Sequence, residues 1–173
     1  MLQYHLAAIE FDVLSDRGIK GIILDLDNTI VSEDDRYISP YAELWIEEAK
    51  SRNFQLFLLS NGKRRHRVSY WSYRLRIPAI SPARKPFPLS LYRALKFMGL
   101  KKRQVLVVGD SWHTDILGAM LFGCSWIQVA SLPHPARWWE KLFGRWLQVP
   151  YPPGFILWET ELTRRKSNAI AAN

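Results

Sequence analysis

The chain of 173 residues contains a single cysteine, Cys124, so it can form no internal disulfide bond. Its first fifteen residues have neither the basic start nor the long apolar run of a signal peptide. No stretch approaches the roughly 20 consecutive apolar residues that a membrane span needs, and we find no internal repeat. These absences exclude a disulfide-rich scaffold and a membrane-spanning protein. They predict a cytoplasmic location, either free or peripheral on the inner face of the membrane.

Acidic residues are also absent from the middle of the chain. Residues 1–48 hold eleven acidic and three basic side chains, whereas residues 49–109 hold fifteen Lys or Arg and no Asp or Glu. Within a net charge of +8, this block is either a solvated basic surface or a source of a field that attracts an anionic ligand. Nucleic acid, acidic lipid and phosphorylated metabolites all carry the required charge.

The length fits one domain over residues 1–173, with a core at about 18–131 and an aromatic, basic C-terminal extension at 132–173. Short apolar runs alternate with longer amphipathic stretches. The patterns predict strands at 21–24, 54–59, 79–80, 105–108 and 126–130, and helices at 41–52, 64–75, 89–98 and 115–122. Because strands and helices alternate, we expect a three-layer α/β fold, with helices on both faces of a central parallel sheet.

Polar residues follow three of the predicted strands directly. Asp25 comes after the strand at 21–24, Ser60 ends the next strand, and Asp110 follows the strand at 105–108. In parallel α/β sheets, ligands bind beyond the carboxyl ends of the strands. We therefore expect these three side chains to face one crevice.

Asp25 and Asp27 are two carboxylates on either side of one residue. Like charges this close are unfavourable unless a cation lies between them. Oxygen ligands favour a hard cation, and Mg²⁺ is the usual choice with a phosphate substrate. One carboxylate can attack phosphorus and form an aspartyl-phosphate, while the other protonates the leaving oxygen and then activates water.

Further residues have the chemistry that phosphoryl transfer needs, which is mainly positioning and charge neutralisation. Ser60 and Asn61 can donate hydrogen bonds to phosphate oxygens, Lys85 supplies a compact positive charge, and Asp110 is another hard oxygen ligand for the metal. Each of these residues alone also fits a structural role in a turn, a cap or a loop. Their order along the chain favours a phosphoryl-transfer site over four separate structural roles.

The order of these residues resembles the four motifs of the haloacid dehalogenase (HAD) superfamily. Residues 25–29 (DLDNT) resemble the first motif, DxDxT, and Ser60 resembles the second. Lys85, which precedes a proline, resembles the third motif, and the stretch from Gly109 to Asp115 resembles the fourth, GDxxxxD. The resemblance implies the Rossmann-like HAD fold and a phosphoric monoester hydrolase activity.

The resemblance also implies a role for each matching residue. Asp25 would be the nucleophile and a metal ligand, and Asp27 the general acid and base, with its backbone carbonyl on the metal. Thr29 would orient Asp27, and Asp115 would support the metal site or replace one of its ligands. The remaining matches are Ser60 with Asn61 for phosphate binding, Lys85 for charge balance on nucleophile and phosphate, and Asp110 as the residue that completes the Mg²⁺ site.

Cap domains of HAD enzymes are inserted after the first or the second motif. Here the intervals 27–60 and 60–85 are filled by ordinary loop, helix and strand, so we expect a capless enzyme with an open site for a bulky substrate. The sequences GIILDLDNT, LLSNG, ARKP and VVGDxxxTDI are similar to the bacterial YqeG-type group of HAD subclass IIIA. That group is similar to the mitochondrial phosphatidylglycerophosphate phosphatases, which makes this anionic phospholipid a candidate substrate.

Other features leave two interpretations open. The basic run 63–67 (KRRHR) fits contact with acidic lipid or RNA, or a solvated helix start. The aromatic pair Trp138 and Trp139 fits an interfacial segment or packing of the extension on the core. Thr114 is predicted to be the N-cap of the last helix, and His113 either lines the pocket or is exposed.

Three functions compete. The first is a Mg²⁺-dependent phosphomonoesterase that acts on a lipid or another bulky phosphate, with peripheral membrane contact. The second is an RNA- or ribosome-associated binding protein that uses the basic block on a HAD scaffold. The third is another HAD activity such as a phosphotransferase. The presence of both Asp25 and Asp27 favours hydrolysis, because a pure binding protein has no need for both carboxylates.

Overall fold

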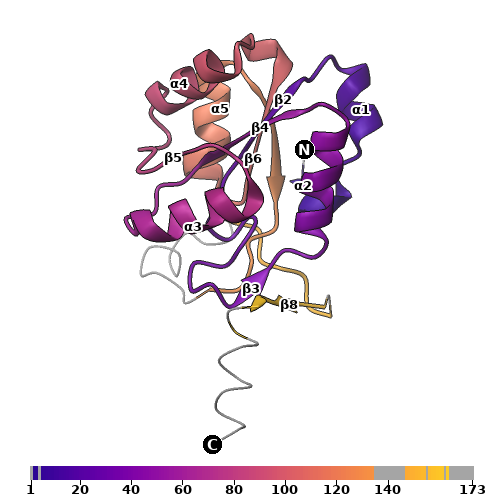
Figure 1. Cartoon of the computed structure of the whole chain (residues 1–173), viewed down its shortest axis with the longest axis vertical. Coiled ribbons are helices and arrows are strands. Elements are labelled where there is room, and N and C mark those ends of the chain that lie inside the picture. Colours follow the sequence, from indigo (N-terminus) through magenta and orange to yellow (C-terminus); the bar gives the residue numbers. More distant parts are fainter. Residues whose placement is uncertain (1, 4, 135–146, 155, 162, 164–173) are drawn as a thin grey trace, which may run out of the picture.

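A six-stranded sheet lies at the centre of the computed structural model, which describes residues 2–3, 5–134, 147–154, 156–161 and 163 (Figure 1). Every pairing in this sheet is parallel. The strand order is β1 (Leu2–Gln3), β7 (Ser125–Val129), β6 (Val105–Gly109), β2 (Gly21–Leu24), β4 (Gln55–Leu59) and β5 (Ala79–Ile80). This order confirms the α/β fold class that the sequence predicts.

The central strands are apolar throughout because both of their faces are covered. Alternate residues of a strand point to opposite faces. Ile22 and Leu24 of β2 therefore belong to one cluster of buried side chains, and Ile23 belongs to the other. The two hydrophobic cores are thus separated by the sheet.

Helices cover both faces and complete the three layers (Figure 1). The first core contains side chains of α1 (Phe11–Asp16), α2 (Ala42–Ser51) and α3 (Arg65–Leu75). The second contains side chains of α4 (Leu89–Met98) and α5 (Leu117–Phe122). Both α4 and α5 end at glycines with positive φ, Gly99 and Gly123, as is typical of helix C-termini.

The predicted strands and three of the four predicted helices agree with the structure to within one residue at each end. The fourth is different, because the chain forms a π-helical turn, η3 (Trp112–Ile116), before α5 begins at Leu117. The sequence patterns did not predict β1, α1 or a small antiparallel sheet of β3 (Tyr37–Ile38) and β8 (Trp158–Glu159). β1, β3 and β8 have only two residues each, and α1 has six, so these elements are too short for periodicity alone to identify them.

Parts of the extension beyond residue 131 pack on the core. Val149 accepts a hydrogen bond from the backbone of Ser131 at 2.7 Å, and the Trp158 ring packs at a tilt against Tyr41 with ring centroids 4.5 Å apart. The Trp138 and Trp139 pair lies outside the described residues. The described parts of the extension thus include residues that pack on the core, as one of the two interpretations expects.

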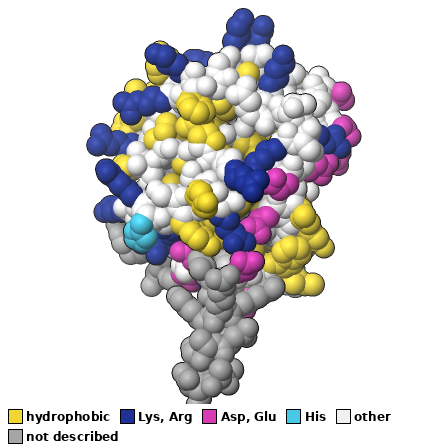
Figure 2. All heavy atoms as spheres, viewed as in Figure 1, with side chains coloured by type: hydrophobic (Ala, Val, Ile, Leu, Met, Phe, Trp, Pro, Cys, Tyr) yellow, Lys and Arg dark blue, Asp and Glu magenta, His cyan; other side chains and the backbone are white. Residues whose placement is uncertain are grey.

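The charge blocks of the sequence occupy different parts of the surface (Figure 2). Lys and Arg side chains spread over the region of α3 and α4, whereas Asp and Glu gather mainly near α1 and α2. Among the described helices, none has both the length and the apolar character needed to cross a membrane.

Candidate active site

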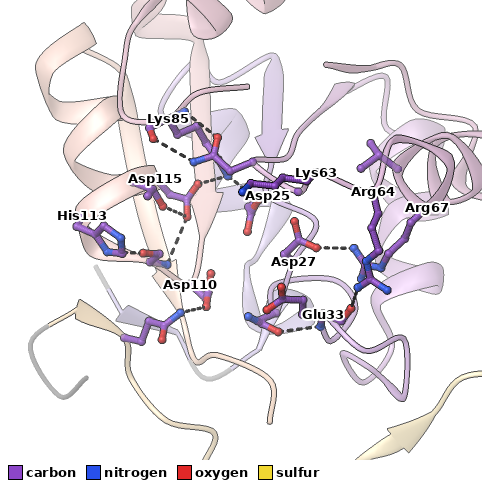
Figure 3. Close-up of a pocket in the computed structure, with 17 residues that line it drawn as sticks. Asp25, Asp27, Glu33, Lys63, Arg64, Arg67, Lys85, Asp110, His113 and Asp115 are labelled. Carbon is purple, nitrogen blue, oxygen red and sulfur yellow. Dashed lines mark hydrogen bonds and ion pairs between the residues drawn. The ribbon is translucent and has the colours of Figure 1, made fainter. Parts of the chain in front are cut away.

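The carboxyl ends of β2, β4 and β6 meet at one pocket of about 490 Å³ (Figure 3). Asp25, Ser60 and Asp110 follow these strands, and their backbones are fixed by the sheet, since Asp25 donates its N–H to Val108 at 2.9 Å. The site residues that line the pocket, as expected from the sequence, are Asp25, Asp27, Asn61, Lys85, Asp110 and Asp115. Asp25 and Asp110 therefore share one pocket, as predicted. Ser60 is fully buried and does not line it, so the expectation that all three side chains face the crevice is wrong for Ser60.

Three buried carboxylates crowd one side of the pocket. The candidate ligand atoms of Asp25, Asp110 and Asp115 all lie within 4.8 Å of one another. Lys85 is the cation among them, with Nζ 2.5 Å from Asp25 and 2.6 Å from Asp115. One ammonium group cannot neutralise three carboxylates, so this side of the pocket carries surplus negative charge.

The surplus charge changes the acidity of these groups. Burial raises the pKa of Asp25 well above its usual range, and Lys85 opposes this only in part. Burial, together with the charge of Asp115, raises the pKa of Asp110 to about 7. Burial alone would lower the pKa of Lys85, but Asp115 and Asp25 outweigh it and hold that pKa above its ordinary value. Lys85 therefore stays charged, and the ionised forms of Asp25 and Asp110 are unfavourable unless a further cation balances them.

The donor set fits a hard divalent cation, because it consists of carboxylate oxygens. The sequence predicts a metal site of Asp25, Asp27 and Asp110. The structure groups Asp25 and Asp110 with Asp115 instead, and the Asp27 side chain points elsewhere (Figure 3). The Asp27 side chain is therefore not part of the carboxylate group that could hold a metal ion.

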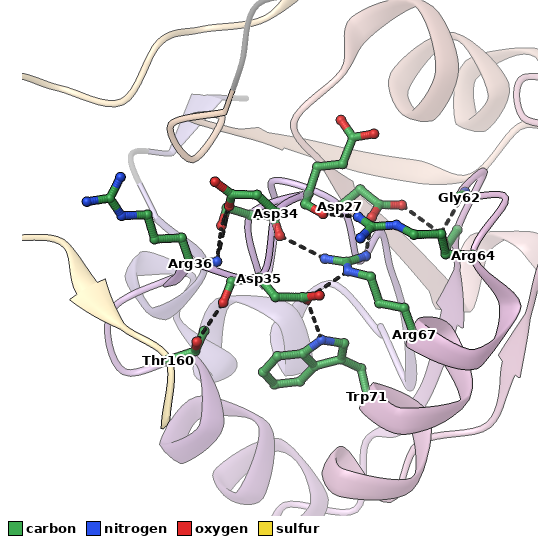
Figure 4. A network of polar contacts seen from close by, with 12 residues as sticks. Asp27, Asp34, Asp35, Arg36, Gly62, Arg64, Arg67, Trp71 and Thr160 are labelled. Atoms are coloured by element: carbon green, nitrogen blue, oxygen red, sulfur yellow. Dashed lines mark hydrogen bonds and ion pairs between the residues drawn. The ribbon is translucent and has the colours of Figure 1, made fainter. Parts of the chain in front are cut away.

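Asp27 is held on the other side of the pocket by two donors. Ser60 donates its hydroxyl to Oδ2 of Asp27 at 2.7 Å, and Arg67 forms an ion pair with Oδ1. The Arg67 guanidinium also contacts Asp35 at 2.7 Å and the carbonyl of Ser32 at 2.8 Å (Figure 4). Asp27 therefore has a fixed orientation that depends on a buried arginine.

Arg67 corrects the interpretation of residues 63–67 as a wholly solvated basic run. Its side chain is 5% exposed, whereas Arg64 and Arg65 are exposed. The reason is helical geometry: Arg67 and Val68 face the core from the first turn of α3, and their neighbours face solvent. Arg67 thus belongs to the pocket, which it lines, and not to the outer surface.

Two supporting residues make contacts that differ from those expected. The hydroxyl of Thr29 lies 3.4 Å from Oδ2 of Asp25, so Thr29 contacts Asp25 and not Asp27. Asn61 uses its side-chain amide on the backbone of Lys85, accepting at 2.8 Å and donating at 3.0 Å. Asn61 therefore fixes the loop that presents Lys85, in addition to lining the pocket.

The fourth motif has a steric basis. A Cβ atom on Gly109 would lie 2.4 Å from Cγ of Asp115, so only glycine allows Asp115 to turn back beneath β6. The π-helical turn at Trp112–Ile116 brings Asp115 to this position. Thr114 lies inside that turn and donates to Asp115 at 3.2 Å, so the prediction that Thr114 is a helix N-cap is wrong.

The comparisons with known proteins agree with this geometry. Residues 82–141 match the HAD-hydrolase-like family model. The chain is 37% identical over 150 residues to the probable phosphatase YqeG of Bacillus subtilis, covering 84% of this chain and 87% of that protein. The chain belongs to the YqeG family of HAD phosphatases.

Solved structures of other proteins share the HAD fold. The cobalt-bound deoxy-D-mannose-octulosonate 8-phosphate phosphatase of Haemophilus influenzae has a TM-score of 0.57 at 16% identity, with 90% of this chain and 89% of that chain covered. A HAD phosphatase of Thermococcus onnurineus also has a TM-score of 0.57, at 13% identity, with coverages of 73% and 98%. At these identities the likeness concerns the fold alone.

Two residues beside Asp110 in this HAD phosphatase were missed in the sequence. Ser131 donates its hydroxyl to Oδ2 of Asp110 at 2.6 Å, and Gln148 donates to the same oxygen at 2.9 Å. Ser131 follows β7 at its carboxyl end, so the rule that found Asp25 and Asp110 would also have found it. Gln148 lies in the extension, and no motif or spacing indicates it.

Proposed function

We propose that this HAD phosphatase hydrolyses phosphate monoesters with Mg²⁺ through an aspartyl-phosphate on Asp25. The observation that supports this most is the position of Asp25, buried at the end of β2 beside Lys85 and facing the pocket that Asp27 also lines. Lys85 holds Asp25 in one orientation and balances charge on the incoming phosphate. Such positioning and charge neutralisation are what phosphoryl transfer requires.

The reaction has two balanced halves. A carboxylate oxygen of Asp25 forms a bond to phosphorus as the bond to the leaving oxygen breaks, and Asp27 gives that oxygen its proton. Asp27 then takes a proton from water, the water oxygen bonds to phosphorus, and inorganic phosphate leaves as the Asp25 carboxylate is restored. Lys85, in a loop that Asn61 fixes, binds the phosphate oxygens throughout, while Ser60 acts through Asp27, to which its hydroxyl donates.

Asp25, Asp110 and the backbone carbonyl of Asp27 would hold the Mg²⁺ ion, with Asp115 as a supporting carboxylate. When bound, the ion neutralises charge on the carboxylates and on the phosphate oxygens. The chain itself keeps these oxygens in place through the ends of β2 and β6 and through the donors to Asp110.

For the substrate we propose an anionic phospholipid monoester, with phosphatidylglycerophosphate as the candidate that the family resemblance implies. Residues 27–85 are all described, and they contain β3, α2, β4, α3 and β5 but no inserted cap domain. A bulky substrate therefore has access to the pocket. The exposed cations Lys63 and Arg64 line it and suit an anionic head group or membrane surface.

We predict that replacing Lys63, Arg64 and Arg65 together with Ser weakens binding to vesicles of phosphatidylglycerol in phosphatidylcholine. Each basic side chain near an anionic membrane contributes on the order of 1 kcal/mol, so three should contribute about 100-fold in affinity. The measurement is vesicle co-sedimentation at several salt concentrations, followed by phosphate release from vesicle-borne phosphatidylglycerophosphate.

A matched triple variant controls for net charge. Lys101, Lys102 and Arg103 precede β6. They therefore lie at the amino ends of the strands, whereas the pocket lies at the carboxyl ends. Replacing them with Ser should leave vesicle binding within a few-fold of the native protein. If both triple variants lose vesicle affinity equally, membrane docking at the pocket is contradicted. Binding to RNA with a steep salt dependence, without binding to vesicles, would favour the RNA- or ribosome-associated function instead.

A further inference from the structure

The C-terminal extension contributes directly to the side of the pocket that holds Asp110. Residues Ser111 and Gln148 form an antiparallel bridge, and Ser131 bridges to Pro150. Gln128, near the end of β7, donates to the carbonyls of Asp110 at 3.0 Å and of Leu147 at 3.4 Å. The segment 147–150 is thus joined to the ends of β6 and β7 by backbone and side-chain contacts.

Among these residues of the extension, Gln148 contacts the Asp110 carboxylate directly. Its Nε2 donates to Oδ2 of Asp110, and Ser131 donates to the same oxygen. Asp110 is 2% exposed, and no residue in the described part of the chain donates a hydrogen bond to its other oxygen, Oδ1. A carboxylate oxygen of Asp110 lies within 4.8 Å of candidate ligand atoms of Asp25 and Asp115. A carboxylate held at one oxygen keeps the other available for a cation.

The same extension supports the opposite side of the pocket. Thr160, next to β8, donates its hydroxyl to the backbone carbonyl of Asp35 at 2.6 Å (Figure 4). The Asp35 carboxylate in turn accepts hydrogen bonds from Arg67 and from the Trp71 indole at 2.9 Å. Arg67 then contacts Asp27. One stretch of chain therefore supports both Asp110 and, through two intermediates, Asp27.

We infer that Gln148 is a positioning residue, which holds the Asp110 carboxylate in the orientation that a divalent cation requires. The inference rests on the proposed function, because it assigns Asp110 to the metal site. Residues outside the direct ligands commonly orient them through such hydrogen bonds, and their loss weakens metal binding by roughly 10- to 100-fold. Gln148 reaches Asp110 from a segment outside the four motifs.

The test measures Mg²⁺ binding to the full chain by calorimetry. Gln148→Leu keeps the volume of the side chain but removes the donor, and we expect Mg²⁺ binding to weaken roughly 10- to 100-fold. Turnover of a soluble aryl phosphate should fall at low Mg²⁺ and recover largely at saturating Mg²⁺. Gln55→Leu is the matched control, because Gln55 is exposed at the start of β4 and should bind Mg²⁺ as the native chain does.

The outcomes separate the two levels of the proposal. If the native chain and Gln148→Leu bind Mg²⁺ equally well, the positioning role is wrong and the proposed function stands. If the native chain neither binds Mg²⁺ nor hydrolyses phosphate esters, the proposed function fails, and the role of Gln148 fails with it. Thermal melting of each metal-free variant confirms that it is folded, and Gln148→Asn, which shortens the amide by one methylene, should also weaken binding.

Discussion

Asp25→Asn is expected to reduce turnover of a soluble aryl phosphate by on the order of 10⁴-fold or more. The amide keeps the shape of the side chain but removes the charge that attacks phosphorus. Asp25 also lies within 2.5 Å of Lys85, so the substitution removes one partner of that ion pair. The measurement is steady-state turnover with saturating Mg²⁺, in a preparation free of host phosphatases.

Folding can be separated from chemistry in this variant. Burial raises the pKa of Asp25, so its ionised form is unfavourable in the folded protein at neutral pH. Lys85 also keeps its ion pair with Asp115 in this variant, so Asp25→Asn should melt at a temperature no lower than the native chain. Asp12→Asn is the matched control, because Asp12 is an exposed carboxylate that pairs with Arg52 on the surface. Substantial turnover in a well-folded Asp25→Asn protein would remove Asp25 from the role of nucleophile.

Arg67→Ala is expected to lower the free energy of unfolding by about 3–5 kcal/mol, the usual effect of removing one partner of a buried ion pair. Arg67 is 5% exposed, and its loss leaves Asp27 and Asp35 without their shared cation. Turnover should also fall strongly, because Asp27 loses one of the two donors that orient it. Chemical denaturation measures the first effect, and turnover at a temperature well below melting measures the second.

Two further variants sharpen this result. Arg65→Ala, two positions earlier on the exposed side of α3, should change stability by less than about 0.5 kcal/mol. Arg67→Lys keeps the charge but cannot contact both carboxylates and the carbonyl of Ser32 with one planar group. It should therefore regain only part of the stability and turnover. If Arg67→Ala were as stable and as active as Arg65→Ala, the buried network would have no role in the site.

The strand-end positions that the sequence predicted share a local origin. Asp25, Ser60 and Asp110 follow apolar strands, and a parallel sheet brings its carboxyl ends together whatever the rest of the chain does. Gly109 and Asp115 are close in sequence, and one steric constraint relates them. Local patterns of this kind carry over directly from sequence to structure.

The residues that were missed depend on contacts between distant segments. Arg67 lies in a basic run, and its burial follows from carboxylates in the loop after β2. Gln148 meets Asp110 only because the extension returns to the ends of β6 and β7. Thr29 was assigned to the wrong aspartate, since a spacing along the chain does not say which of two nearby carboxylates a hydroxyl will contact. Such choices are made by tertiary packing.

The most direct measurement is turnover of a soluble aryl phosphate by the native chain, first in excess chelator and then with Mg²⁺ added back. The proposed function assigns a divalent cation to the three buried carboxylates, which have one lysine among them. We expect no turnover in chelator, full recovery with Mg²⁺, and poor recovery with Ca²⁺, which prefers longer bonds and more ligands. Full turnover in excess chelator would contradict a metal-dependent reaction at Asp25.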